Sequence, residues 1–309
     1  MKAAAPGKLI LSGAYAVLHG APALVAAVDR YVIADSGAPA SRVTPEVRAT
    51  LGHARAPSFD ASALREGDQK LGLGSSAAIA VASLAAVLLE REPMRSDASL
   101  HEEVFRRVLK GHREAQGGGS GVDVAASTYG GVLAATLQDD SLHLTPVRLP
   151  ERLQIEVWFS GTSASTPRML AAVDALAQDH PLRFRTLLAR LQEVAHATLH
   201  SLDADGVEAF VDCLDQQAEA LAQLGDAAQV PIVTQSVAEL RAQARPRGST
   251  VMPSGAGGGD SVLYAGTEPP GRELVELRDQ FGYRPLALRL GARGVHALGP
   301  DGVPAAWNS

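Results

Sequence analysis

Three glycine-rich loops carry the side chains of this sequence that are best suited to chemistry. The first loop, Leu71-Gly72-Leu73-Gly74-Ser75-Ser76, runs directly into an alanine-rich segment of high helix propensity at 77–91. Glycines let a backbone approach a ligand closely, and the positive N-terminal end of a helix favours anions. The loop therefore predicts a phosphate site in which Ser75 and Ser76 offer hydroxyls to phosphate or Mg²⁺. The alternative is a serine that only caps the helix.

This first loop differs from two common phosphate-binding loops. It is not a Walker loop, because no Gly-Lys-Ser/Thr follows, and it lacks the third glycine of the dinucleotide fingerprint. The sequence thus indicates a phosphate loop of another kind.

The second loop runs from Gly117 to Gly121 and leads to Asp123. A carboxylate held at a fixed position beside a ligand loop can orient or deprotonate an attacking hydroxyl in phosphoryl transfer. The alternative is a helix N-cap or an Asx-turn residue. The third loop, Pro253 to Asp260, is dense in glycine and flanked by apolar, strand-like residues. Such a backbone surrounds a ligand with N–H groups or lets two segments pack closely.

Composition limits the classes of function. The chain has 309 residues, 46% of them hydrophobic and 20% charged, with a formal net charge of −6 and no basic run. This charge argues against a nucleic-acid partner, but a small anionic metabolite needs only a few local cations. Cys213 is the single cysteine, so an intramolecular disulfide and a cysteine-based zinc site are excluded. The sequence shows no signal peptide and no apolar stretch of about 18 residues, so we expect a cytoplasmic protein without a membrane partner.

The predicted secondary structure that must position the loops changes near residue 160, from mixed strands and helices to mainly helices. Before it, strand patterns occupy 8–12, 23–34, 133–137 and 153–159, and helical patterns occupy 77–91 and 100–115. After it come helical patterns at 167–178, 182–202, 207–224, 233–244 and 272–281, with strands at 261–265, 286–290 and 294–298. Residues 36–69 predict short strands and loops whose positions stay open. We predict two domains, 1–160 and 161–309.

The order and spacing of these motifs resemble the GHMP kinases over nearly the whole chain. Pro6-Gly7-Lys8 with Ser12-Gly13-Ala14-Tyr15-Ala16-Val17 is similar to their first motif. Residues 71–78 are similar to the second motif, the phosphate-binding loop, and residues 254–260 to the third. The resemblance implies an α/β (α+β) fold, with an N-terminal domain like ribosomal protein S5 domain 2, a helix-rich C-terminal domain and a site between them.

Within that superfamily the chain looks most like the phosphomevalonate kinases. His112-Arg113-Glu114-Ala115-Gln116-Gly117 followed by residues 119–127 is similar to that family, as are residues 159–166, the three successive glycines at 257–259, and Lys70 before the second motif. Mevalonate kinases usually place a metal-binding glutamate where His112 stands. Three features depart from the pattern: Ala14 replaces a glutamate, Met252 replaces a common basic residue, and Leu18-His19-Gly20 reads more like mevalonate kinase.

The resemblance implies ATP-dependent phosphorylation of phosphomevalonate, with ATP and Mg²⁺ as cofactors. It implies Lys8 and Asp123 as catalytic residues and Ser76 as a metal ligand. The implied nucleotide-binding residues are Gly72, Leu73, Gly74, Ser75, Ser76 and Ala77. The implied substrate-binding residues are Lys70, His112, Gln116, Ser120, Gly121, Ser165, Thr166, Arg168, Gly257 and Gly258.

Two other functions stay open on the sequence. In a mevalonate kinase the acceptor is a neutral alcohol, so Asp123 would have to act as a base. A catalytically silent homologue would bind a metabolite or nucleotide as a sensor, and Ala14 and Met252 are the departures that favour it. The sequence leaves a monomer and a homodimer equally open.

Overall fold

The computed structural model describes residues 1–162, 164–202 and 206–299. It contains two compact units that are not consecutive in sequence. Unit 1 comprises Met1–Leu9, Val25–Leu133 and the C-terminal segment from Leu288, and unit 2 comprises Ile10–Leu24 and Ala134–Ala287. The domains predicted at 1–160 and 161–309 are family domains, whereas these units are defined by compactness. The predicted domain boundary therefore stays a prediction. Ser163, part of the 159–166 motif, lies outside the described residues.

One sheet is built on the two long N-terminal strands, β1 (Lys2–Ser12) and β2 (Pro22–Pro39). Its strand order is β12-β1-β2-β6-β7, with β3 added to β2. The other strands are β3 (Pro57–Asp60), β6 (Val132–Gln138), β7 (Ser141–Pro146) and β12 (His296–Leu298). β12 runs antiparallel to β1 with Ala297 opposite Ala3. The segment after residue 288 therefore returns to the first strand. A short hairpin, β4 (Arg65–Glu66) with β5 (Gln69–Lys70), precedes the first glycine loop.

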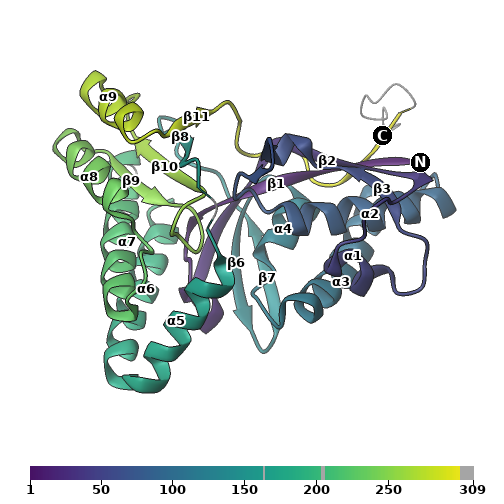
Figure 1. Ribbon diagram of the computed structural model, residues 1–309, viewed down its shortest axis with the longest axis horizontal. Helices are drawn as coiled ribbons and strands as arrows, with labels where there is room; N and C mark the ends of the chain where they lie inside the picture. The colour runs from purple at the N-terminus through teal and green to yellow at the C-terminus, as the bar shows by residue number, and fades with distance from the viewer. Residues whose placement is uncertain (163, 203–205, 300–309) are drawn as a thin grey trace. The chain divides into compact units, whose positions relative to one another are not determined.

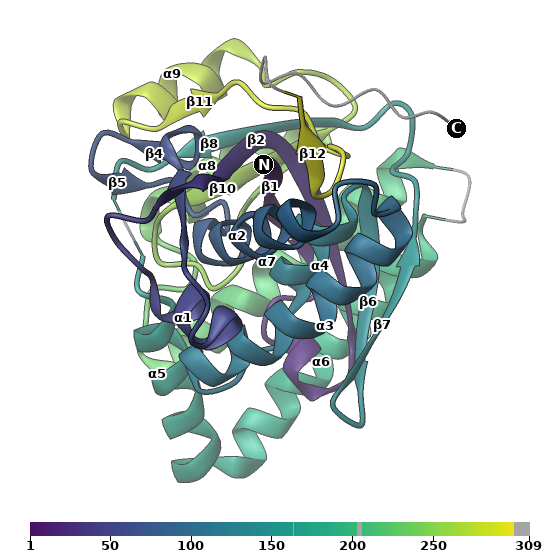
Figure 2. The same ribbon diagram turned by 90° about the vertical axis from the view of Figure 1, so that its right-hand side faces the viewer.

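The helices of unit 1 pack around one buried helix. α2 (Ser75–Arg91) is buried at every position from Ala77 to Leu89, as expected for a helix that is apolar all round. α1 (Pro45–Leu51), α3 (Asp97–Gln116) and α4 (Val122–Tyr129) each contact it, and Figure 2 shows these helices side by side. α1 and α3 approach closely because position 111 is glycine: a β-carbon there would lie 2.7 Å from Thr50 N.

Unit 2 combines an antiparallel sheet with long helices (Figure 1). The sheet order is β11-β8-β10-β9, formed by β8 (Gln154–Phe159), β9 (Thr250–Pro253), β10 (Ser261–Gly266) and β11 (Arg284–Leu286). The helices are α5 (Thr166–Asp179), α6 (Pro181–His200), α7 (Val207–Ala228), α8 (Gln235–Ala244) and α9 (Arg272–Gln280). Trp158 and Tyr264 stack with ring centroids 5.8 Å apart in a core that α8 and α9 also contact. Short 3₁₀ turns occupy Ala16–His19, Ser62–Leu64 and Arg245–Arg247.

Most predicted elements are confirmed, and the exceptions have physical causes. The predicted strand at 286–290 is wrong, because β11 ends at Leu286. The residues after it contact β2 without forming a regular ladder: Arg289 N donates to Asp29 Oδ1 over 2.6 Å, and Leu290 forms an isolated bridge with Val28. α1 was not predicted. Its signals are local, since the Thr44 side chain accepts a hydrogen bond from Val47 N over 3.3 Å and Pro45 occupies the first turn.

Candidate active site

The first glycine loop is joined to β1 by a lysine. Lys8 N donates to Leu73 O over 2.9 Å, and Lys8 Nζ donates to Gly72 O over 3.3 Å. The aliphatic part of the Lys8 side chain packs against Gly74, where φ is +73° and a β-carbon would lie 2.7 Å from Lys8 Cγ. Only glycine fits this position, both because of its left-handed backbone and because of the lysine. The structure thus places an ammonium group against the loop that begins α2.

The N-terminus of α2 has no side-chain cap. Gly74 is the N-cap residue, and Ser75 and Ser76 lie inside the first turn, so the cap-only alternative for these serines is wrong. The first backbone N–H to find a helical partner is that of Ala78, which donates to Gly74 O over 3.1 Å. The N–H groups of Ser75, Ser76 and Ala77 precede it and have no carbonyl partner within the helix. Together with the helix dipole they form an anion-binding end of the kind that phosphates occupy.

Gln116, the last residue of α3, contacts this end of α2. Its Nε2 donates to Ser76 Oγ over 3.4 Å and to Glu46 Oε1 over 3.3 Å. Burial acts to raise the pKa of Glu46, but hydrogen bonds from its own backbone N–H, Gln116 and Thr44 outweigh it and leave the pKa below its ordinary value. An ionised carboxylate therefore anchors the amide that reaches Ser76.

Asp123 lies in the first turn of α4, beside a buried histidine. The N-cap is Gly121, so Asp123 is not the cap residue. Its Oδ1 accepts a hydrogen bond from Val124 N over 2.9 Å, and its Oδ2 lies 3.4 Å from His112 Nε2. The side chain of Asp123 is 23% exposed, whereas that of His112 is 4% exposed. The carboxylate can therefore reach solvent, and the imidazole is enclosed behind it.

The second glycine loop is fixed by Arg113. Its Nε donates to Gly119 O over 3.1 Å and its Nη2 donates to Ser120 O over 3.3 Å. Ser120 Oγ accepts from Val122 N over 3.5 Å. Arg113 thus shapes the loop that leads into α4, and Ser120 helps to start that helix. Any substrate contact by Ser120 or Gly121 stays a prediction.

The cations and hydroxyls predicted for the acceptor are mostly exposed. Lys70 is exposed at the end of β5 in unit 1. In unit 2, Ser165 is the N-cap of α5 without a capping side-chain bond, and Thr166 and Arg168 are exposed in its first turn. These side chains are available to a ligand, and their predicted substrate contacts stay a prediction.

The third loop uses its glycines for close packing in unit 2. A β-carbon at Gly257, where φ is +74°, would collide with the Ile232 backbone, and Gly258 N donates to Ile232 O over 3.0 Å. Ser254 Oγ accepts from Ile10 N and donates to Ile10 O, both over 3.1 Å. Of the two uses expected for this loop, close packing is therefore the one that the contacts establish. Ligand binding by Gly257 and Gly258 stays a prediction.

Two polar residues that contact the predicted motifs were not identified from the sequence. Gln217 of α7 is buried, and its Oε1 accepts from Ser12 Oγ over 2.6 Å and from Gly13 N over 3.0 Å, so it fixes the turn of the first motif. Nothing in its helical context marks it. Glu46 lies in the stretch whose elements stayed open, although Thr44-Pro45 ahead of it is a helix-start signal.

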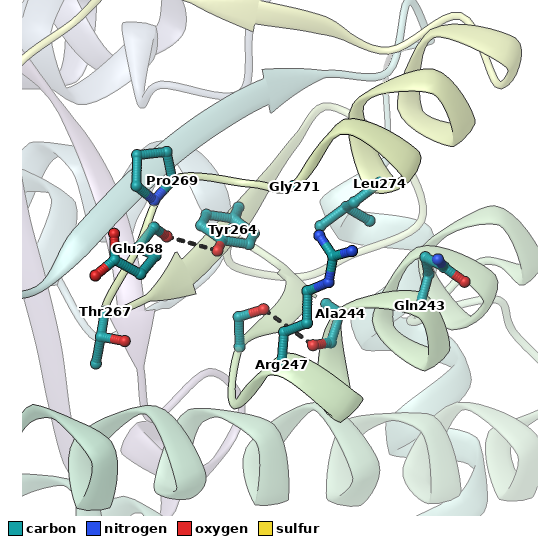
Figure 3. A pocket seen from close by; sticks show the side chains of 10 residues that line it. Gln243, Ala244, Arg247, Tyr264, Thr267, Glu268, Pro269, Gly271 and Leu274 are labelled. Atoms are coloured by element: carbon teal, nitrogen blue, oxygen red, sulfur yellow. Dashed lines mark hydrogen bonds between the residues drawn. The ribbon is translucent and has the colours of Figure 1, made fainter.

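A separate cavity lies in unit 2, away from the predicted residues. It has a volume of about 190 Å³ and lies between α8, β10 and the start of α9, where the Arg247 side chain points past Gly271 (Figure 3). Tyr264 Oη donates to Glu268 O over 2.7 Å at its wall. Among the described residues, its lining includes none of the predicted site residues. This cavity is therefore distinct from the predicted site.

Comparisons with known proteins agree with this arrangement of loops. Residues 42–131 match the family model of the GHMP kinases N terminal domain. The chain is 25% identical to the phosphomevalonate kinase of Streptomyces sp. (strain CL190), over 94% of this chain and 97% of that protein. It is 28% identical to the mevalonate kinase of Archaeoglobus fulgidus, over 89% of this chain and 96% of that protein.

A solved structure extends the likeness to the fold. The Streptococcus pneumoniae phosphomevalonate kinase in complex with phosphomevalonate and AMPPNP has a TM-score of 0.76 to this chain, at 17% identity, covering 94% of this chain and 99% of its own. The chain therefore resembles the GHMP kinases over nearly its whole length. Its α/β fold with a helix-rich unit is the GHMP kinase fold, as the motifs predicted.

The segment that matches the family model contains most of the residues predicted to carry chemistry. Residues 42–131 include Glu46, the first two glycine loops, α2, His112, Gln116 and Asp123. Lys8 lies outside the segment but is bonded to its first loop. None of the helices in the described part of the chain has an apolar stretch that would cross a bilayer.

Proposed function

We propose that this protein transfers the γ-phosphoryl group of ATP to phosphomevalonate. The observation that carries the kinase chemistry is the N-terminus of α2, where Lys8 Nζ and the first-turn N–H groups lie at one loop. Support for the acceptor comes from the likeness to a phosphomevalonate kinase over nearly the full length. The presence of His112, where mevalonate kinases usually have a metal-binding glutamate, favours the same acceptor.

ATP would place its phosphates over the first turn of α2. Glycines at 72 and 74 let the backbone approach the phosphates, and the helix end supplies N–H donors and a positive dipole. Lys8 adds a full positive charge to stabilise the charge of the transferred group. Ala77 belongs to the same turn and contributes its backbone N–H.

Mg²⁺ fits the groups that surround Ser76. The described residues contain no cluster of three histidine, cysteine or acidic side chains that could form an all-protein metal cage. Mg²⁺ commonly keeps several waters and binds through few protein groups plus substrate phosphates, and Ser76 Oγ is an oxygen ligand held by Gln116. When bound, the ion would neutralise charge on the β- and γ-phosphates. Ser76 is the residue that we assign to hold it.

Asp123 would orient the acceptor phosphate. The second pKa of a phosphate monoester is about 6, so its oxygen is already ionised near pH 7 and needs no strong base. Positioning and charge neutralisation must then supply most of the rate enhancement. The Asp123 side chain is partly exposed and has a fixed backbone contact, which suits such an orienting role. Lys70 and Arg168 are the exposed cations that we assign to the acceptor's charge.

Mevalonate is the second candidate acceptor. The 28% identity to an archaeal mevalonate kinase and the Leu18-His19-Gly20 sequence favour it. A coupled assay of ADP release with each acceptor, at matched Mg²⁺ and ATP, separates the two. Turnover of phosphomevalonate but not mevalonate is the expected result. Turnover of mevalonate alone would replace the proposed acceptor, and no turnover with either, despite nucleotide binding, would favour the silent homologue.

A further inference from the structure

His112 has almost no accessible surface from which to bind a substrate. Its side chain is 4% exposed, and its buried Nε2 forms no hydrogen bond with any residue that the structure describes. A buried polar atom without a partner costs about 1–3 kcal/mol. The nearby acceptor is Asp123 Oδ2, at 3.4 Å. This contact is long for a hydrogen bond, but catalytic hydrogen bonds are often long before substrates bind and shorten in the complex.

We propose that His112 is the positioning residue of Asp123: its Nε2–H donates to Oδ2 and fixes the carboxylate toward the acceptor. The proposal rests on the proposed phosphoryl transfer and assigns His112 a place behind the carboxylate instead of a contact with substrate. Val124 N already holds Oδ1, so a donor at Oδ2 would remove the remaining rotational freedom of the side chain. Both constraints come from packed helices, α3 and α4, which are rigid supports for a functional group.

The same pair bears on the choice of acceptor. An alcohol acceptor needs a group that takes its proton, whereas an ionised phosphate needs only orientation. A carboxylate with both oxygens fixed, as proposed for Asp123, is suited to orienting an acceptor that reacts through an oxygen already carrying charge.

The test is a double-mutant cycle on His112 and Asp123. His112→Leu removes the donor, and His112→Gln retains an amide N–H near the position of Nε2. We expect His112→Leu to lower kcat by about 10²-fold with the KM for ATP unchanged, and His112→Gln to recover most of that loss. The double variant His112→Leu/Asp123→Asn should be no slower than Asp123→Asn alone, because residues that act as a unit are not additive.

A matched control is His296→Leu, since His296 is equally buried at 4% exposure but lies on β12. It should lower the thermal midpoint without changing kcat. The cycle is run with whichever acceptor the wild-type enzyme turns over, so a wrong acceptor does not obscure the result. Multiplicative losses in the double variant would overturn the proposal, as would equal losses in His112→Leu and His112→Gln, or wild-type kcat in His112→Leu.

Discussion

Gln116 Nε2 lies 3.4 Å from Ser76 Oγ, so the last residue of α3 holds a hydroxyl in the first turn of α2. One helical turn earlier, His112 lies behind Asp123. Residues four apart share one face of a helix. One face of α3 therefore supports both Ser76, which we assign to Mg²⁺, and Asp123, which we assign to the acceptor. The carboxylate of Glu46 anchors this arrangement from α1.

Asp123→Asn should lower kcat by at least about 10²-fold, the usual scale for a positioned acid–base or orienting group. The side chain is partly exposed and packs no core, so the thermal midpoint should stay near that of the wild type. Steady-state kinetics and a thermal melt on the same sample make the measurement. Glu114→Gln, an exposed carboxylate near the end of α3, is the control and should be unaffected. Turnover near the wild-type rate would show that the acceptor lies elsewhere.

Ser76→Ala should raise the Mg²⁺ concentration needed for nucleotide binding by about 10-fold or more, on the scale of a lost contact to a charged group. The reason is that Ser76 Oγ is the hydroxyl held in place by Gln116. Isothermal titration of ATP at several Mg²⁺ concentrations measures the effect without turnover. Ser75→Ala is the matched control, one residue earlier, and should change this dependence less. An unchanged Mg²⁺ dependence in Ser76→Ala would remove the metal role from Ser76.

Lys70→Ala and Arg168→Ala should each raise the acceptor KM by roughly 10- to 150-fold and the ATP KM little. Losing a charge-assisted contact to phosphate costs about 1.5–3 kcal/mol, and both side chains are exposed and ready to make one. Arg183→Ala on α6, also exposed, controls for the loss of surface charge. If either variant kept the wild-type acceptor KM, that residue would be an ordinary solvated cation.

Asp215→Asn should lower the free energy of unfolding by about 1–3 kcal/mol at pH 7. Asp215 Oδ1 and Oδ2 accept from Arg241 over 2.7 and 2.9 Å, and Oδ1 also accepts from Thr250 over 2.9 Å. Burial acts to raise the pKa of Asp215, but these bonds leave it below its ordinary value of 3.8.

The sign of the pH effect follows from that lowered pKa. The unfolded chain binds the proton more readily, so the stabilisation is full above about pH 4 and is lost as the pH falls through the lower folded value. Urea unfolding at pH 7 and pH 3 should therefore show a smaller gap between wild type and Asp215→Asn at pH 3. Asp212→Asn, exposed on the same helix, should match the wild type at both values. A gap that is constant with pH would mean that the carboxylate charge is not the cause.

The sequence by itself determined the parts of this protein that depend on neighbouring residues. The first glycine loop and α2 follow from residue types that are adjacent in the chain, because left-handed glycines and helix propensity act locally. The long helices of unit 2 were predictable for the same reason, because helix propensity acts between neighbouring residues. The order of the motifs was enough to predict the GHMP kinase fold.

Only the tertiary structure decided which side chains meet. Lys8 and Gly72 are 64 residues apart, and Glu46 and Gln116 are 70 apart, so no spacing in the sequence encodes either contact. The tertiary structure also distinguished the roles of the glycine loops. The third loop packs against Ile232, whereas the first leads to the uncapped N-terminus of α2. The structure also places His112 in a buried position beside Asp123, which the sequence did not reveal. The reason is that burial and partner choice arise from the packing of α1, α3 and α4 around α2, which depends on the whole unit.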